Sequence, residues 1–224
     1  MVESPYSCVL WDVDGTIADA SAGILPRLVE VFASYGLPAP HASELSLWIG
    51  PPMFESFRDR GGMSTAQAEE AVLKYRALAA RDGYAASVAI YPGVPEVLRA
   101  VGDAGIPQAT ASSKPENQVI AILEHYDLMR FFTAVAGARP DAAGRHDDKS
   151  AVIRRALDRL AAVGADTSRP VLIGDRRHDV EGAEPYGIPV IYAEWGFGEP
   201  GEGDGAAARV SAASDLLPLL LGAH

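Results

Sequence analysis

In the stretch "SCVLWDVDGTIADA" (residues 7–20), an apolar run ends with two aspartates on alternate positions, followed at once by Gly and Thr. The run itself, "CVLW" (8–11), is short, wholly apolar and bounded by a turn, which is typical of a central strand in a parallel sheet. Charge at the end of a buried strand is costly to desolvate. Asp12 and Asp14 therefore indicate that something is bound or reacts at this strand end.

Four later apolar runs have the same character, and helical patterns stand between them. The apolar runs are 106–112, 133–138, 170–175 and 188–193, and the helical patterns cover 94–105, 114–126 and 149–164. Strand and helix alternate, which predicts an α/β fold with a Rossmann-like parallel sheet and helices on both faces. The Gly- and acid-rich stretch 198–208 is expected to be a mobile surface loop.

Residues 18–88 break this alternation and predict a helical insert without strands. Two segments in it have helical patterns, 22–36 and 64–83. Ser64 stands at the N-cap position of the second, with Gln67 placed to complete a capping box. The predicted domains are an α/β core formed by residues 1–17 and 89–224 and a helical cap domain formed by residues 18–88.

The composition excludes several classes of partner. The 224 residues include 19 Lys plus Arg and 30 Asp plus Glu, and the net charge of −11 repels nucleic acid and anionic membranes. We therefore expect neither as a partner, and an anionic substrate would need a local positive site. Cys8, the single cysteine, forms no intrachain disulfide. Neither a signal peptide nor a membrane span is evident, so a cytoplasmic location is expected.

Further polar groups fall at the ends of the predicted strands. Ser112 and Ser113 follow the second strand, where they would also cap the next helix. Asp175 follows the fourth strand with Asp179 four residues on, and Lys149 begins a predicted helix. Ligands bind beyond the carboxyl ends of strands in open α/β sheets, so we expect these groups to converge with the two aspartates of the first strand.

The chemistry that these groups suit is phosphoryl transfer. A carboxylate attacks phosphorus to form an aspartyl-phosphate, and a divalent cation and a lysine neutralise the phosphoryl oxygens. Mg²⁺ takes oxygen ligands and one or two protein carboxylates, which Asp12 and Asp175 would supply. Asp14 is placed to protonate the leaving group and then to activate water. Gly15 permits a tight turn whose amides, with a serine hydroxyl, would hold phosphate oxygens.

Four segments, in order, resemble the motifs of the haloacid dehalogenase-like hydrolase superfamily. They are "DVDGT" (12–16), a serine followed by "SKPE" (112–116), Lys149 and "IGDRRHD" (173–179). The resemblance covers nearly the whole chain. The helical insert resembles the C1-type cap of the phosphoglycolate-phosphatase-like branch, and "WGFG" (195–198) also looks closest to that branch.

The resemblance implies a role for each matched position. It implies that Asp12 is the nucleophile and a Mg²⁺ ligand. Asp14 would be the general acid/base, which also ligates the metal through its backbone carbonyl. Asp175 would be the metal ligand of the fourth motif, and Asp179 would support the ligands from outside the coordination sphere.

Two of the implied assignments have a neighbouring alternative. Ser112 matches the hydroxyl of the second motif, with Ser113 as the alternative one residue on. Lys149 matches the lysine of the third motif, with Lys114 as its rival. The spacing to the fourth motif and the amphipathic helix that follows favour Lys149.

The expected function is Mg²⁺-dependent hydrolysis of a small-metabolite phosphomonoester, of the phosphoglycolate or 5′-nucleotide type, through an aspartyl-phosphate. A sugar phosphomutase of the same fold is the alternative, which Thr16 disfavours, and a non-enzymatic phospho-accepting signalling domain is less favoured. The expected partner is a small phosphorylated metabolite, and the chain is either a monomer or a homodimer. Residues 49–58 form a candidate specificity loop. Arg176 is expected at the surface or in a salt bridge, with a contact to the cap or the substrate as the alternative.

Overall fold

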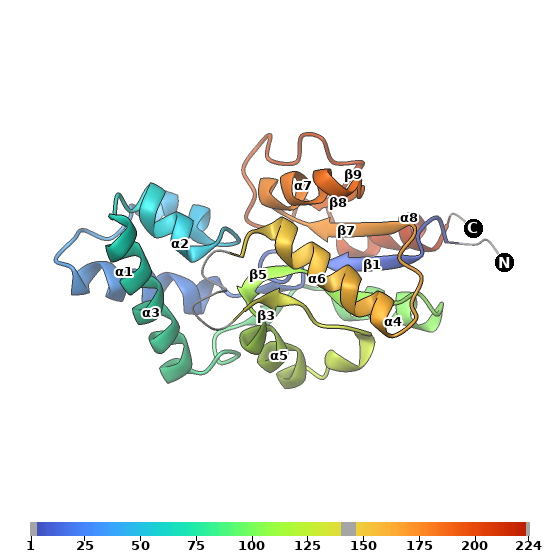
Figure 1. The fold of residues 1–224 in the computed structure, drawn as a ribbon, viewed down its shortest axis with the longest axis horizontal. Helices are drawn as coiled ribbons and strands as arrows, with labels where there is room; N and C mark the ends of the chain where they lie inside the picture. The colour runs from blue at the N-terminus through green and yellow to red at the C-terminus, as the bar shows by residue number, and fades with distance from the viewer. Residues whose placement is uncertain (1–3, 140–146, 223–224) are drawn as a thin grey trace.

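The computed structural model describes residues 4–139 and 147–222, and a parallel sheet of five strands lies at its centre (Figure 1). In spatial order the strands are β4 (Gln108–Thr110), β1 (Cys8–Trp11), β7 (Pro170–Gly174), β8 (Val190–Ala193) and β9 (Ala208–Val210). Val9 of β1 lies opposite Gln108 on one side and Val171 on the other. The strand that precedes the two aspartates is therefore an inner strand with a parallel partner on each side.

The sheet continues beyond β4 in a less regular form. β5 (Ser112–Pro115) and β6 (Gly137–Ala138) form a separate parallel pair. An isolated bridge joins Ala109 of β4 to Ala134, and the amide of Ala111 donates to the carbonyl of Trp11 at 2.7 Å. The predicted strand at 133–138 is thus reduced to two residues and one bridge.

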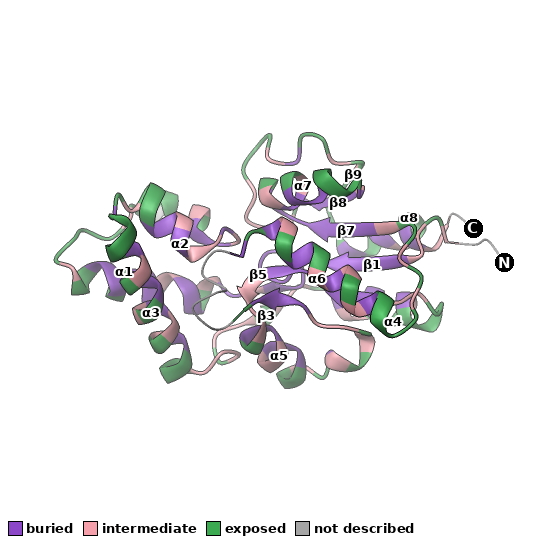
Figure 2. Cartoon of the chain, viewed as in Figure 1, coloured by how far each residue is buried: buried purple, intermediate pink, exposed green. Residues whose placement is uncertain are grey.

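Helices cover both faces of the sheet. They are α4 (Val94–Asp103), α5 (Glu116–His125) and α8 (Leu216–Leu221) on one face, and α6 (Lys149–Ala162) and α7 (Arg177–Ala183) on the other. Side chains of a strand alternate between the faces, so Val9 and Trp11 pack in the first cluster whereas Cys8 and Leu10 pack in the second. Figure 2 shows these strands buried between helices that are exposed on their outer sides. The predicted α/β fold class is confirmed.

The helical insert has a hydrophobic cluster of its own. Its elements are β2 (Ala18–Asp19), α1 (Ser21–Ser34), η1 (Ala42–Trp48), α2 (Met53–Glu55), η2 (Ser56–Arg60), α3 (Thr65–Asp82) and β3 (Ala89–Ile90). The ring of Trp48 lies 5.4 Å from that of Phe32 and 5.6 Å from that of Phe57, between centroids. The predicted capping box of Ser64 and Gln67 is present at the start of α3. Short 3₁₀ turns elsewhere are η3 (Met129–Phe131), η5 (Glu184–Tyr186) and η6 (Ala213–Asp215).

Short strands account for the main corrections to the predicted elements. β2 lies within 18–88, where no strand is expected, and pairs antiparallel with β3, which directly follows the insert. β9 pairs in parallel with β8 and begins at Ala208, the last residue of the stretch 198–208 that is predicted as a loop. Two- and three-residue strands show no readable alternation, so their pairing is set by the neighbouring strand and not by their own sequence.

In residues 4–139 and 147–222, no helix is both long and apolar enough to span a bilayer.

Candidate active site

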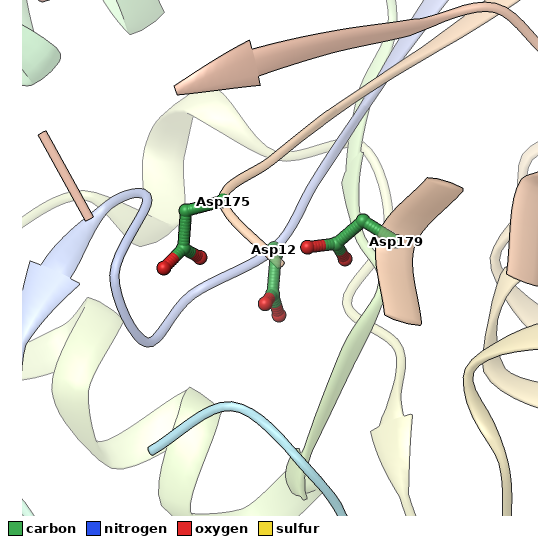
Figure 3. A group of neighbouring side chains, drawn as sticks. All are labelled: Asp12, Asp175 and Asp179. Atoms are coloured by element: carbon green, nitrogen blue, oxygen red, sulfur yellow. The ribbon is translucent and has the colours of Figure 1, made fainter. Parts of the chain in front are cut away.

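Three aspartates from different segments meet at the carboxyl end of the sheet (Figure 3). Asp12 follows β1, Asp175 follows β7, and Asp179 lies in the first turn of α7. One carboxylate oxygen from each lies within 4.8 Å of the other two, and all three residues are buried. The pairing of β1 with β7 produces this meeting, because the amide of Asp12 donates to the carbonyl of Ile173 at 2.9 Å.

Two lysines are divided between the aspartates of "DVDGT". The ammonium of Lys149 lies 2.9 Å from a carboxylate oxygen of Asp12 and 2.6 Å from one of Asp179. The ammonium of Lys114 lies 2.9 Å from a carboxylate oxygen of Asp14. Lys149, and not Lys114, is therefore beside the predicted nucleophile, as the sequence favours. The pairing of Lys114 with Asp14 was not foreseen.

Glycines allow the chain to pass close to Asp175. Gly15 has φ +90°, and a Cβ atom there would lie 2.0 Å from a carboxylate oxygen of Asp175. A Cβ atom at Gly196 would lie 2.3 Å from the same carboxylate. Neither position has room for a side chain. The tight turn expected at Gly15 therefore also packs against the carboxylate of the fourth motif.

Both oxygens of Asp175 have a neutral hydrogen-bond donor. The hydroxyl of Thr16 donates to one oxygen at 3.1 Å, and the amide of Phe197 donates to the other at 2.8 Å. The indole N–H of Trp195 donates to the carbonyl of Thr16 at 3.1 Å. No role at this carboxylate is predicted for Thr16 from the sequence. The signals that could have indicated one are the place of Thr16 in "DVDGT" and the "WGFG" segment.

The site buries more negative than positive charge. In the part of the chain that the structure describes, the buried carboxylates of Asp12, Asp14, Asp175 and Asp179 lie beside two ammonium groups, those of Lys114 and Lys149. Burial raises the pKa of Asp14 and raises that of Asp175 well above its usual value, and neighbouring carboxylates add to both shifts. Burial also raises the pKa of Asp179 to about 6, even though Lys149 opposes the shift.

A divalent cation with oxygen ligands fits this donor set. Mg²⁺ prefers carboxylate oxygens, and its charge would offset the surplus of buried carboxylates. Lys149 stays charged here: burial alone would lower its pKa, but Asp12 and Asp179 raise it overall. Lys149 and the amide of Arg176, at 2.9 Å, hold the two oxygens of Asp179. Both oxygens of Asp179 thus already have protein partners.

The two candidate serines have different environments. Ser112 is buried, and its hydroxyl accepts the amide N–H of Lys114 at 3.3 Å. Ser113 lines a cavity of about 40 Å³ with Asp14 and Lys114. The expectation that the pair caps the next helix is wrong, because Pro115 precedes α5 and no side chain caps it. The side chain of proline has no oxygen to accept the amide N–H groups of the first turn, and the serines lie too far before the helix.

The insert supplies the opposite wall of that cavity. Its lining residues from the insert are Ile24, Gly50, Pro51, Met53 and Tyr75, and those from the core include Pro115 and Gln118. Part of the candidate specificity loop 49–58 therefore faces Asp14. Arg176, expected at the surface or in a salt bridge, forms a salt bridge with Glu202 and is buried.

A parallel sheet whose strand ends gather buried carboxylates and lysines defines an α/β enzyme with a site suited to a hard metal ion. The chain belongs to the haloacid dehalogenase-like hydrolase family, which its sequence matches over residues 9–193.

The chain is also similar to named relatives and to a solved structure. The chain is 36% identical to the tyrosine-protein kinase PtkA of Mycobacterium tuberculosis over 88% of its own length, but it spans only 64% of that relative. It is 33% identical to a 5′-nucleotidase of Pseudomonas aeruginosa, covering 88% of this chain and 86% of the relative. A phosphoglycolate phosphatase of Caulobacter vibrioides is 32% identical, with 85% of this chain and 80% of the relative covered. The crystal structure of a predicted phosphatase from Clostridium acetobutylicum superposes with a TM-score of 0.86 at 30% identity, covering 94% of this chain and 96% of that one.

Proposed function

We propose that the protein is a Mg²⁺-dependent phosphatase that hydrolyses the phosphomonoester of a small metabolite through an aspartyl-phosphate on Asp12. One observation carries the proposal. Asp12 lies beside Lys149 and the metal-competent carboxylates, and Asp14, two residues on, faces the cavity between core and insert. The family and the relatives named phosphatase and nucleotidase support the same reaction.

In the first step, a carboxylate oxygen of Asp12 attacks phosphorus and the bond to the alcohol oxygen breaks. Asp14 gives its proton to that oxygen. Burial raises the pKa of Asp14, which helps it to hold the proton until then. Lys149 neutralises charge that develops beside Asp12. When bound, Mg²⁺ would supply further positive charge at the phosphoryl oxygens.

In the second step, water attacks phosphorus and loses a proton to Asp14. Free phosphate leaves and Asp12 is regenerated. We propose that the side chains of Asp12 and Asp175 and the backbone carbonyl of Asp14 hold the metal. We propose that Asp179 supports them from outside, since one of its oxygens pairs with the charged ammonium of Lys149 and the other accepts the amide of Arg176, whereas the donors to Asp175 are neutral.

The substrate belongs to the phosphoglycolate or the 5′-nucleotide type, since relatives of both names cover most of this chain. Its leaving group would face Asp14 at the boundary between the core and Gly50 and Met53 of the insert. The two predicted domains, the cytoplasmic location and the lack of a nucleic-acid or membrane partner remain predictions from the sequence.

The test compares Asp12→Asn with the wild type on p-nitrophenyl phosphate and on a panel of metabolite phosphates with Mg²⁺. We expect the variant to lose more than about 10³-fold in kcat, because an amide is a poor nucleophile. Asp103→Asn is the matched control, since Asp103 is exposed and lies outside the site. Equal activity of Asp12→Asn and wild type would end the proposal.

Transfer of the phosphoryl group to an acceptor other than water is the second candidate. The identity to a relative named tyrosine-protein kinase favours a protein hydroxyl, and a sugar phosphomutase would use a sugar hydroxyl. Incubation with labelled ATP and a protein acceptor tests transfer to a protein hydroxyl, and incubation with a labelled sugar phosphate tests the mutase by the appearance of the isomeric sugar phosphate. Label in the acceptor, with no phosphate released in the panel, would favour transfer over hydrolysis.

A further inference from the structure

The side chain of Arg176 joins three segments that are far apart in the sequence. It is 1% exposed although it carries a charge. Its Nε and Nη2 donate to the two carboxylate oxygens of Glu202 at 2.8 and 3.0 Å. Its Nη1 donates to the backbone carbonyl of Ile49. Arg176 follows β7, Glu202 lies in the loop after β8, and Ile49 belongs to the helical insert.

Only arginine has the donors for this arrangement. A planar guanidinium binds a carboxylate through two parallel bonds and still has a nitrogen for a third acceptor, whereas lysine has one ammonium point. Burial by itself lowers the pKa of Arg176, but the Glu202 carboxylate raises it overall, so the group stays charged. The amide of Arg177 also donates to Glu202 at 3.1 Å, which fixes the carboxylate.

The insert lies directly on this arginine. Gly50 has φ +101°, and a Cβ atom there would lie 2.8 Å from the Cγ of Arg176. Glycine is required at Gly50 both by the backbone conformation and by this contact. Gly50, with the next residues Pro51 and Met53, lines the cavity beside Asp14. The position of Arg176 therefore determines where one wall of that cavity stands.

The backbone around Arg176 also contacts the carboxylate site. Its amide donates to Asp179 at 2.9 Å. Phe197, whose amide donates to Asp175, packs its side chain against the hydrophobic cluster of the insert. The carboxylates and the insert are thus held by one continuous set of contacts.

We propose that Arg176 is a positioning residue that fixes the loop Ile49–Met53 of the insert over the active site. The inference rests on the proposed phosphatase function. Arg176 does not touch the reacting atoms. It holds the wall against which the leaving group lies, so its loss should weaken the binding and alignment of substrate while Asp12, Asp14 and Lys149 stay in place.

Hydrogen exchange of the unliganded protein tests the hold on the loop. In Arg176→Met, we expect the amides of residues 49–60 to exchange about tenfold faster, because a charged hydrogen bond to the loop is lost. Exchange in β1 and β7 should not change. Arg154→Met is the matched control, since Arg154 is exposed on α6 and its side chain pairs with Asp158, at 3.9 Å. Wild-type exchange of residues 49–60 in Arg176→Met would overturn the proposal.

Steady-state kinetics tests the consequence for the reaction. We expect kcat/KM of Arg176→Met to fall about 10- to 100-fold, with a rise in KM, and that of Arg154→Met to stay at the wild-type value. Arg176→Lys should recover little of the lost kcat/KM, because lysine restores the charge but not the two parallel hydrogen bonds to Glu202. Full recovery by lysine, or unchanged kcat/KM in Arg176→Met, would refute positioning by Arg176.

The outcomes separate this inference from the proposed function. If the wild type hydrolyses no phosphomonoester, the proposed function fails, and hydrogen exchange still decides whether Arg176 holds the loop. If Arg176→Met does not fold, Glu202→Gln replaces it, since it weakens the pair without deleting the guanidinium. Faster exchange of residues 49–60 in Glu202→Gln supports the inference, and unchanged exchange contradicts it.

Discussion

The orientation of Asp175 depends on two neutral donors that come from different parts of the chain. Thr16 comes from the turn after β1, and the amide of Phe197 comes from the loop after β8. Donors that hold a metal-ligand carboxylate fix its direction, and their loss weakens metal affinity as loss of a ligand does, to a smaller degree. Thr16 is fully buried, so no water replaces its hydroxyl.

The variant Thr16→Val keeps the shape of the side chain and removes the hydroxyl. We expect its dissociation constant for Mg²⁺ to rise about 10- to 100-fold, because one oxygen of Asp175 loses its donor. Calorimetric titration with Mg²⁺ measures the constant. Thr110→Val is the matched control, since the Thr110 hydroxyl is also buried but bonds only to Ala136. An equal loss of affinity in both variants would refute a specific role for Thr16.

A site residue can be predicted from the sequence when its signal lies within its own segment. Asp12, Asp14 and Asp175 could be found from the sequence, because Asp12 and Asp175 stand at the ends of apolar runs, Asp14 lies two residues after Asp12, and the carboxyl ends of parallel strands meet. For Arg176, the sequence offers a contact to the cap only as an alternative, and the residues that it binds could not be found in this way. Its partners, Glu202 and Ile49, lie 26 and 127 residues away, and nothing in either local pattern specifies the contact.

The elements with signals inside their own sequence agree best with the prediction. Helix α3 begins with a capping box that is complete within four residues, Ser64 to Gln67. Strand β9 has only three residues, of which Arg209 is exposed, and its place is set by pairing with β8. The antiparallel pair of β2 and β3 likewise depends on a contact across the whole insert. Local chemistry predicts where helices begin, whereas short strands need the folded neighbour.

Removing the cap of α3 should destabilise the insert. We expect Ser64→Ala to lower the free energy of unfolding by about 1 kcal/mol, because the amide of Gln67 loses its acceptor. Urea denaturation followed by circular dichroism measures the change. Thr65→Ala is the control, since Thr65 is exposed at the next position and does not cap the helix. A loss in Ser64→Ala no larger than in Thr65→Ala would show that this cap does not stabilise the protein.

At the scale of the whole molecule, the fold accommodates a charge excess at one end of its sheet. The carboxylates of Asp12, Asp14, Asp175 and Asp179 are buried at that end. Their burial raises the pKa of Asp14, Asp175 and Asp179. A carboxyl whose pKa is raised by folding stabilises the protein only where it is protonated. The metal-free protein is therefore less stable at neutral pH, where buried carboxyls ionise, than at a lower pH, where they are protonated.

The pH dependence of the metal-free protein follows from Asp179. Its pKa is about 6 when folded, against an ordinary value of 3.8, so its contribution is present below the ordinary value and is lost as pH rises through 6. With EDTA present, lowering the pH from about 7.5 to about 5 should raise the melting temperature of the wild type by on the order of 5 °C more than it raises that of Asp179→Asn. Differential scanning calorimetry measures both proteins.

Mg²⁺ should stabilise the protein most at a pH where the buried carboxylates are ionised. Because a divalent cation binds the ionised carboxylates, it should raise the melting temperature of the wild type at about pH 7.5 and much less at about pH 5, where protons compete for Asp179 and its neighbours. Asp103→Asn should respond to pH and to Mg²⁺ as the wild type does. If acidification stabilises Asp179→Asn as much as the wild type, or if Mg²⁺ stabilises equally at both pH values, the surplus of buried charge does not limit the stability of this fold.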